Sequence, residues 1–204
     1  MNLALKRQPF GPADVNTKNR RMSNRLLIIG ASSSRKSINR ELAIWAGQQF
    51  DADLDDVDLN DFEMPIYSED RQADSGIPSL AHDFKGKIKA CDGIIVSFAE
   101  HNGSYTAAFK NIIDWVSVIE KELWEHKPML LLSTSPGKRG GKTLLELAAS
   151  DFPLRAGRVC AHFALPSFYA NFEHGIKNQI LRTEFDIAAT SLRDAIAKDE
   201  LKRR

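Results

Sequence analysis

The sequence predicts an α/β fold in three layers, a sandwich with a five-stranded parallel sheet of strand order 2-1-3-4-5 between two layers of helices. Strand-like and helix-like segments alternate from residue 25 onward, which is typical of a parallel sheet with crossover helices. Several strand-like segments are continuous apolar runs, as expected for strands buried on both faces. Each crossover is expected to be right-handed, and five such strands with helices on both faces favour this order.

Five segments carry the strand pattern. The first is an apolar run that ends in Gly30, and the second is an acidic region around Leu54, Val57 and Leu59. The third is the most apolar and is therefore expected to be central. The expected strands span residues 25–30, 54–59, 92–98, 129–134 and 158–165.

Helical spacing of apolar residues predicts five helices between and after these strands. They are expected at residues 37–50, 78–90, 106–123, 142–149 and 176–199. The clearest is the third, in which Phe109, Ile112 and Val116 belong to one apolar stripe. Residues 60–77 are expected to be irregular, and an aromatic-rich loop at 168–172 is expected before the last helix.

Composition restricts the class of protein. The 204 residues suit one domain, which we place at residues 25–200. Lys and Arg number 28 and Asp and Glu number 27, and this balance favours neither nucleic acid nor an anionic membrane as a partner. No apolar stretch approaches the length of a membrane span. Cys91 and Cys160 lie in strand-like runs, which indicates reduced core residues and a cytoplasmic protein.

Residues 1–24 differ from the rest of the chain. They are polar, contain Pro9 and Pro12, and carry several basic residues against one acid, Asp14. This composition predicts a disordered extension. A start codon assigned too early, with Met22 as the true start, and an arm that embraces a partner subunit are the alternatives.

The loop after the first expected strand is rich in hydroxyl groups and leads directly into a helix; residues 30–39 read Gly-Ala-Ser-Ser-Ser-Arg-Lys-Ser-Ile-Asn. A phosphate needs hydrogen-bond donors in a positive local field, which free amides at a helix start, hydroxyls and nearby cations supply. Ser32, Ser34 and Ser37 can donate through hydroxyls and Asn39 through its amide, whereas a simple helix cap at Ser37 is the alternative. The glycine patterns of triphosphate and dinucleotide loops are absent, so a single monophosphate, as in FMN, is expected.

Two further loops follow the third and fourth expected strands. Residues 98–106 combine an Asn-Gly turn with small residues and an aromatic, which suits a planar flavin ring, although a plain turn before a helix also fits. Residues 133–141 contain three glycines within five positions, which lets backbone amides approach a ligand, although a flexible connection also fits. All three loops leave the carboxyl edge of the sheet, where doubly wound folds bind ligands.

In this order the motifs resemble those of the NADPH-dependent FMN reductases, a flavodoxin-like family that includes related quinone, azo and chromate reductases. Residues 30–39 resemble the family's phosphate loop, and residues 64–67 resemble its Leu-Pro-Leu-Tyr segment. Residues 100–115 resemble its most specific block, Glu-Tyr-Asn-Gly-Ser-Tyr followed by Lys-Asn-x-x-Asp-Trp. The chain departs from the pattern at Ala99, where the family usually has Pro, and at His101, where it usually has Tyr.

The resemblance implies that the first loop holds the FMN phosphate and that the ring lies between the other two loops. The expected cofactor-binding residues are Ser32, Ser34, Ser37, Ile38, Asn39, Phe98, Ala99, Glu100, His101, Asn102, Ser135, Pro136, Gly137 and Gly140. The resemblance also implies a homodimer or homotetramer with the flavin near the subunit interface. We expect no catalytic acid or base and no metal ligand, because the flavin carries the chemistry.

We therefore expect an NAD(P)H-dependent FMN oxidoreductase that passes hydride through bound flavin to a small-molecule electron acceptor, such as a quinone, free flavin or an azo compound. The sequence does not decide between NADPH and NADH, because it shows no clear clamp for a 2′-phosphate. One alternative is a flavodoxin-like electron carrier without NAD(P)H turnover, which the near-neutral charge mildly disfavours. A second is a regulator that binds a phosphate ligand and no flavin.

Overall fold

The computed structural model describes residues 23–203, so the expected extension at residues 1–24 lies almost entirely outside the described residues. The described chain forms a five-stranded parallel sheet in the order β2-β1-β3-β4-β5, which confirms the predicted topology. The strands are β1 (Asn24–Ala31), β2 (Ala52–Val57), β3 (Gly93–Phe98), β4 (Pro128–Thr134) and β5 (Arg158–Leu165). β1 is the first strand along the described chain, and the strand order reverses there.

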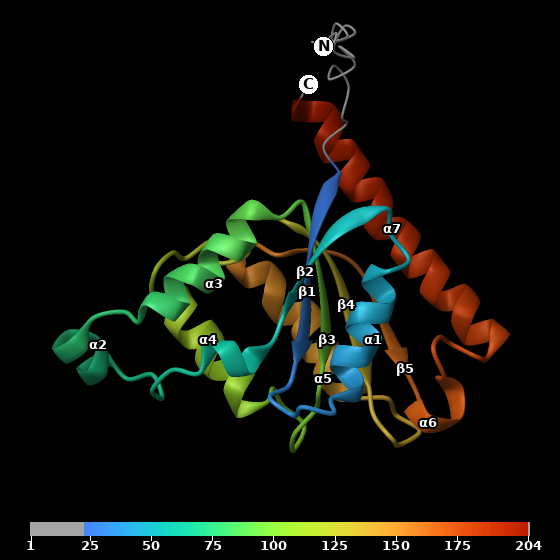
Figure 1. Ribbon diagram of the computed structural model, residues 1–204, viewed down its shortest axis with the longest axis horizontal. Helices are drawn as coiled ribbons and strands as arrows, with labels where there is room; N and C mark the ends of the chain where they lie inside the picture. The colour runs from blue at the N-terminus through green and yellow to red at the C-terminus, as the bar shows by residue number, and fades with distance from the viewer. Residues whose placement is uncertain (1–22, 204) are drawn as a thin grey trace, which may run out of the picture.

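Helices cover both faces of the sheet (Figure 1). On one face lie α3 (Ser79–Ala90), α4 (Ala107–Ser117) and α5 (Lys142–Asp151); on the other lie α1 (Ile38–Gly47) and α7 (Gln179–Arg203). Alternate residues of each strand face opposite layers, so Leu27 of β1 packs in the first core and Leu26 in the second. The result is the expected three-layer sandwich.

Burial increases from the edge of the sheet to its centre. Every residue of β3 and β4 is buried, as expected for strands with helices on both sides. β2 lies at an edge and is acidic, and carboxylates at an edge discourage pairing with another chain. Asp55 and Asp56 of β2 and the following Asp58 are paired with cations: Arg40 lies 2.7 Å from Asp56 and 2.9 Å from Asp58, and Lys87 lies 2.8 Å from Asp55.

Several segments differ from the sequence-based prediction. The stretch 60–77, which we expected to be irregular, holds a 3₁₀ helix (Leu59–Phe62) and α2 (Glu69–Ser75). α2 buries none of its residues, so no apolar stripe marks it in the sequence. It starts because Ser68 caps it, accepting a 3.2 Å hydrogen bond from the backbone N–H of Arg71.

Helix ends were predicted less well than helix positions. α4 ends at Ser117 rather than at 123, and the apolar residues that follow it reach the core from a loop that contains the buried Leu123. A second 3₁₀ helix (Phe152–Arg155) follows α5, and α6 (Phe168–Asn171) lies within the aromatic-rich loop. α7 begins three residues later and ends four residues later than predicted.

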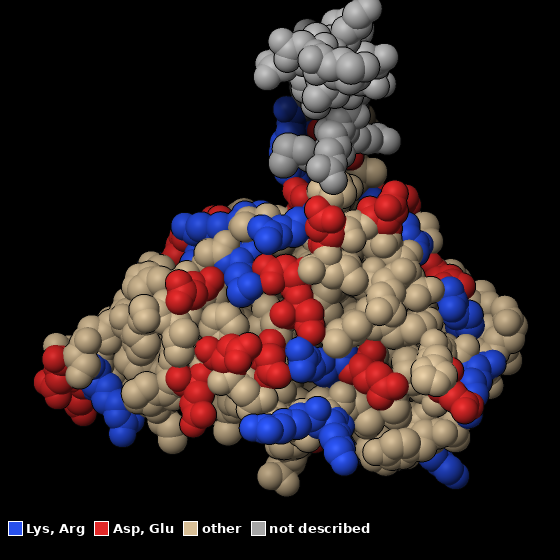
Figure 2. Space-filling model, viewed as in Figure 1, with Lys and Arg blue, Asp and Glu red and all other residues tan. Residues whose placement is uncertain are grey.

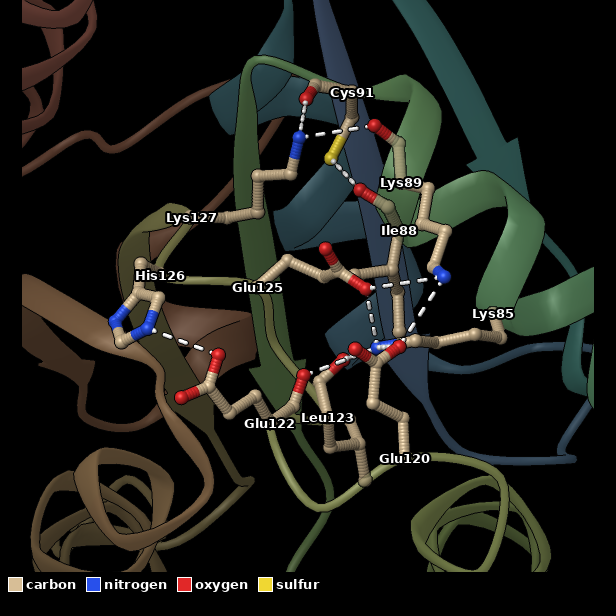
Figure 3. A network of polar contacts seen from close by, with 10 residues as sticks. All are labelled: Lys85, Ile88, Lys89, Cys91, Glu120, Glu122, Leu123, Glu125, His126 and Lys127. Carbon is tan, nitrogen blue, oxygen red and sulfur yellow. Dashed lines mark hydrogen bonds and ion pairs between the residues drawn. The ribbon is translucent and has the colours of Figure 1, made fainter.

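A buried lysine organises the amino edge of the sheet (Figure 3). Lys85 of α3 is only 2% exposed, and its Nζ donates to the backbone carbonyls of Glu122 (3.0 Å) and Leu123 (2.9 Å). The same Nζ lies 2.6 Å from Oε1 of Glu125 and 3.3 Å from Oε2 of Glu120. This network fixes the segment between α4 and β4 against α3, at the end of the sheet opposite to the three predicted site loops.

Charges of both signs are interspersed over the face drawn in Figure 2, which fits the small net charge. Many cations of the described surface have a carboxylate partner, as Lys110 has in Asp114 and Arg182 in Asp186. A search of residues 23–203 finds no helix with the length and hydropathy needed to cross a bilayer.

Candidate functional site

The three predicted loops meet at the carboxyl edge of neighbouring strands. They follow β1, β3 and β4, which are adjacent in the sheet, and we call them the first, second and third loops (residues 31–37, 99–106 and 135–141). The strand order reverses at β1, so the first loop lies at the switch point where doubly wound folds bind ligands. The structure therefore brings the three sets of predicted residues to one edge.

The first loop presents hydrogen-bond donors at the start of α1. Ser37 is the N-cap and its Oγ accepts a 3.2 Å hydrogen bond from the N–H of Arg40, so the predicted cap exists, and the hydroxyl hydrogen is still able to donate. The N–H groups of Ile38 and Asn39 have no partner among the residues that the structure describes. Ser34 is exposed, whereas the Oγ of the buried Ser32 accepts from the N–H of Ser34 (3.2 Å) and shapes the turn.

Gly30 allows this loop to enter the helix directly. A Cβ at this position would lie 2.5 Å from the Cα and Cβ of Arg40 in α1. Such a distance is far below van der Waals contact, so only glycine permits the end of β1 and the first turn of α1 to approach so closely. The close approach aims the start of α1 at the sheet edge.

Asn39 has a role that the sequence did not reveal. Its side chain is buried, and its Nδ2 donates to the carbonyl of Thr134 (3.1 Å). Its Oδ1 accepts from the N–H of Thr134 (3.0 Å) and from the Oγ of Ser97 (2.9 Å). Asn39 thus joins α1 to the ends of β3 and β4. A carboxamide nitrogen carries two hydrogens, so one remains to donate to a ligand.

The second loop is a tight turn. His101 and Ser104 exchange backbone hydrogen bonds of 3.0 and 3.1 Å around Asn102 and Gly103, both of which adopt positive φ. His101 and Asn102 are exposed, and Phe98 is buried at the end of β3. The plain-turn interpretation is therefore correct for the backbone, and the turn displays the predicted residues at the site edge.

Glu100 links the second loop to the start of α5, the helix that follows the third loop. Gly141, the N-cap of α5, has no side chain to cap the helix, and the Oε2 of Glu100 accepts a 3.3 Å hydrogen bond from the N–H of Leu144. A carboxylate at a helix N-terminus is favoured by the helix dipole. Ala99 beside it is half-buried. Glu100 therefore holds the second loop against the start of α5, directly after the third loop.

The third loop is held from both sides. The Oγ of Ser133 donates to the carbonyl of Gly140 (2.8 Å), and the carbonyl of Gly137 accepts from the N–H of Ser167 (2.9 Å). Gly140 has φ +59°, and a Cβ there would lie 2.7 Å from the carbonyl oxygen of Leu165. Gly140 is therefore buried inside the loop, whereas Pro136 and Gly137 are exposed and Ser135 is half-buried.

Three further residues shape the site and were missed by sequence reasoning. Thr106 is buried, and its Oγ1 donates to the carbonyl of Ala31 (3.1 Å), which ties the first loop to the second. Ser97 and Thr134 form hydrogen bonds with the side chain of Asn39, and the Oγ1 of Thr134 also donates to the carbonyl of Leu165 (2.8 Å). Ser97 and Thr134 stand near the ends of otherwise apolar strands, and that position was the signal available in the sequence.

Two segments singled out by the resemblance are in direct contact. The Nδ2 of Asn111 donates to the carbonyls of Met64 (3.0 Å) and Pro65 (3.1 Å), and its Oδ1 accepts from the N–H of Tyr67 (2.8 Å). The Nε1 of Trp115 donates to the carbonyl of Pro65 (2.6 Å). This clamp borders a hollow of about 330 Å³ between α4 and the chain after β2, which reaches Ser33 of the first loop.

The donors present fit FMN. A phosphate can use the free N–H groups of Ile38 and Asn39, the serine hydroxyls and two exposed cations, Arg35 and Lys36, which form no ion pair with any described residue. A doubly wound sheet with such a loop after β1 and two further loops beside it defines a flavodoxin-like protein. The model of the family described as NADPH-dependent FMN reductase matches residues 24–169, and the chain belongs to this family.

Individual relatives agree with this result. A protein of Mycoplasma pneumoniae whose function is uncharacterised is 30% identical over 157 residues, which cover 74% of this chain and 93% of that protein. A 2-hydroxy-1,4-benzoquinone reductase of Burkholderia is 32% identical over 122 residues, or 58% of this chain and 64% of that enzyme. The solved structure of FerB, a flavoenzyme NAD(P)H:(acceptor) oxidoreductase from Paracoccus denitrificans, shares the fold with a TM-score of 0.67, at 21% identity over 86% of this chain and 98% of that one.

The family assigns the chemistry. The chain is an oxidoreductase that uses FMN with NAD(P)H as co-substrate and reduces small acceptors through the flavin. The comparisons give no support to the electron-carrier alternative.

Proposed function

We propose that the protein is an NAD(P)H:acceptor oxidoreductase whose FMN phosphate binds at the first loop and whose flavin ring lies between the second and third loops. The observation that carries this proposal is the donor set at the start of α1: N–H groups of Ile38 and Asn39 that no described residue pairs, the hydroxyls of Ser34 and Ser37, and no carboxylate among residues 30–40. A dianionic phosphate is the ligand that such a helix start favours.

The chain's own residues bind the cofactor and orient it. Bound FMN supplies the hydride chemistry, accepting from NAD(P)H and passing to the acceptor. The turn at His101–Ser104 and the exposed Ser135–Gly137 backbone present small residues and amides to a planar ring. Glu100 and Asn39 keep the loops at a fixed spacing, so the ring enters a site that is already formed. His101 is a proposed neighbour of the ring.

Small-molecule electron acceptors, above all quinones, are the proposed second substrates. The Burkholderia relative is named as a benzoquinone reductase, and residues of this chain align with it over 122 positions. We place the enzyme in the cytoplasm, which agrees with two free cysteines, one of them the buried Cys91. Desolvation raises the pKa of Cys91 to about 11, so this thiol is unreactive at neutral pH.

We also propose a homodimer or homotetramer. Ile66 is 75% exposed at the edge of the 330 Å³ hollow, which is lined by the apolar side chains of Leu59, Phe62 and Met64. An exposed aliphatic side chain beside a hollow with an apolar part is suited to a two-fold interface in which each copy inserts this side chain into the hollow of the other. Light scattering of the purified protein measures this directly, and a monomer at micromolar concentration would contradict it.

The function is tested with purified protein that has been incubated with FMN and freed of unbound flavin. We expect flavin absorbance to remain with the protein and NAD(P)H to be oxidised steadily when a benzoquinone is added. Ser34→Ala is expected to weaken FMN binding several-fold, because it removes one hydroxyl donor, whereas Ser75→Ala in α2 serves as a control and leaves binding unchanged. If the protein binds flavin but does not oxidise NAD(P)H, the result would favour the electron-carrier alternative. If it binds no flavin, the proposal is refuted.

A further inference from the structure

The tip of the third loop, formed by Lys138 and Arg139, carries two cations that are not needed to bind the FMN phosphate. Lys138 and Arg139 are adjacent and exposed, and neither forms an ion pair with any residue in the range 23–203. Lys142 follows at the start of α5, and its Nζ lies 3.7 Å from the Oε1 of Glu146. The third loop leaves β4, two strand spacings or roughly 10 Å from the first loop on β1. A phosphate held at the first loop leaves these cations available.

The structure holds this tip in one shape. The carbonyl of Gly137 accepts from the N–H groups of Ser167 (2.9 Å) and Gly140 (3.2 Å), so both ends of the tip are fixed. The guanidinium of Arg139 donates to the Oγ1 of Thr143 (2.7 Å) and is therefore already oriented. Gly140, which follows the tip, adopts a left-handed conformation and packs so closely against Leu165 that it leaves no room for a Cβ. Lys138 and Arg139 are therefore displayed by an ordered loop and not by a flexible tail.

The charge pattern at this tip favours an anion. Several other exposed cations of the described chain have an acid one helical turn away, for example Lys110 with Asp114. Between Ser135 and Thr143 there are three cations and no acid. Adjacent like charges repel each other, and a bound dianion relieves that repulsion. Arg and Lys together suit a phosphate, since Arg donates through a planar fork and Lys acts as a point charge.

We propose that the tip formed by Lys138 and Arg139 binds the 2′-phosphate of NADPH and makes the enzyme select NADPH over NADH. This inference rests on the proposed function, in which the ring lies beside Ser135–Gly137, directly before the tip in the chain. NADPH differs from NADH by one phosphomonoester of nearly two negative charges. A nicotinamide placed on the flavin brings the rest of the dinucleotide past the neighbouring loop, where these cations lie.

The test compares both nicotinamides on FMN-loaded protein. The double variant Lys138→Gln/Arg139→Gln is expected to lower kcat/KM for NADPH about 10- to 100-fold, the effect of losing charge-assisted hydrogen bonds, mainly through KM. The value for NADH is expected to change less than about two-fold, because NADH lacks the phosphate that these side chains bind. Lys198→Gln/Lys202→Gln, on exposed positions at the far end of α7, is the matched control and leaves both values unchanged.

A binding measurement provides a second readout. By calorimetry on the FMN-loaded enzyme, 2′,5′-ADP is expected to bind more tightly than 5′-AMP, and the double variant is expected to lose that difference. Equal binding of the two nucleotides, or an equal loss of NADPH and NADH activity in the double variant, would overturn the assignment. If the wild-type enzyme binds FMN and oxidises neither nicotinamide, the proposed function itself fails. If it oxidises both and the variant leaves their ratio unchanged, only the phosphate assignment fails.

Discussion

Replacing Asn39 tests whether this residue holds the fold together or only binds the cofactor. In the structure its carboxamide pairs with the N–H and C=O of Thr134 and with the hydroxyl of Ser97, and all of these groups are buried. Asn39→Ala leaves three buried polar groups without partners. Each such group costs about 1–3 kcal/mol, but neighbouring losses do not add fully. We expect the free energy of unfolding to fall by about 3–5 kcal/mol.

The assay is urea unfolding of the flavin-free protein, followed by far-UV circular dichroism. Flavin-free protein is essential, because bound FMN would stabilise the folded state by mass action and obscure the effect. For a domain of this size the expected loss corresponds to a fall in Tm of roughly 10 °C. Ser34→Ala is the matched control, since Ser34 is exposed and lies in the loop that leads into α1, the helix of Asn39. It is expected to change FMN affinity without changing the stability of the flavin-free protein.

One result would refute this reasoning. If Asn39→Ala lowered the flavin-free stability by less than about 1 kcal/mol while weakening FMN binding strongly, the bridge to Ser97 and Thr134 would be unimportant, and Asn39 would act as a phosphate ligand alone.

Two further predictions concern charged groups. Lys85→Met is expected to lower the free energy of unfolding by about 3 kcal/mol, because it leaves the carboxylate of Glu125 and two backbone carbonyls without their buried partner. Denaturant unfolding measures this loss, and an unchanged free energy of unfolding would contradict the prediction by showing that the methionine packs equally well. The N–H of Asn60, together with Arg40, holds the pKa of Asp58 below its ordinary value, so its charge stabilises the fold above the unfolded pKa and this contribution is lost as pH falls through the folded pKa. Asp58→Asn is therefore expected to cost up to about 1 kcal/mol at pH 7, and this cost shrinks only as the pH falls below the unfolded pKa of about 3.9 and through the folded pKa. A cost in urea titrations that is the same at pH 7 and at about pH 2 would contradict the assignment.

The sheet was predictable from sequence because its central strands are apolar runs. Burial on both faces of β3 and β4 leaves no polar side to interrupt the pattern, and right-handed crossovers then restrict the strand order. α2 escaped prediction for the opposite reason, since it buries no residue and depends on the cap at Ser68. α4 was predicted too long because apolar residues at helical spacing continue past Ser117 although the chain has left the helix.

The site was predictable as a set of loops and less so as a set of contacts. Loop positions follow from strand ends, and these are marked by Gly30, by Asn102-Gly103 and by the glycines around residue 140. The sequence does not mark the direction in which a side chain points. Asn39 can donate to a phosphate or to a strand end, and its spacing in sequence is the same in both cases. Lys138 was passed over because a charged loop residue is by default only solvated.

The ties between the loops bear on how tightly the enzyme can hold its cofactor. Thr106 joins the first loop to the second, Glu100 joins the second to α5, and Ser167 fastens the third. Ordering a free loop around a ligand costs conformational entropy at the moment of binding, and that loss is subtracted from the affinity. Here the chain loses that entropy when it folds. The flavin can therefore bind to loops that already have their final shape, and the free energy of its contacts contributes almost fully to its binding affinity.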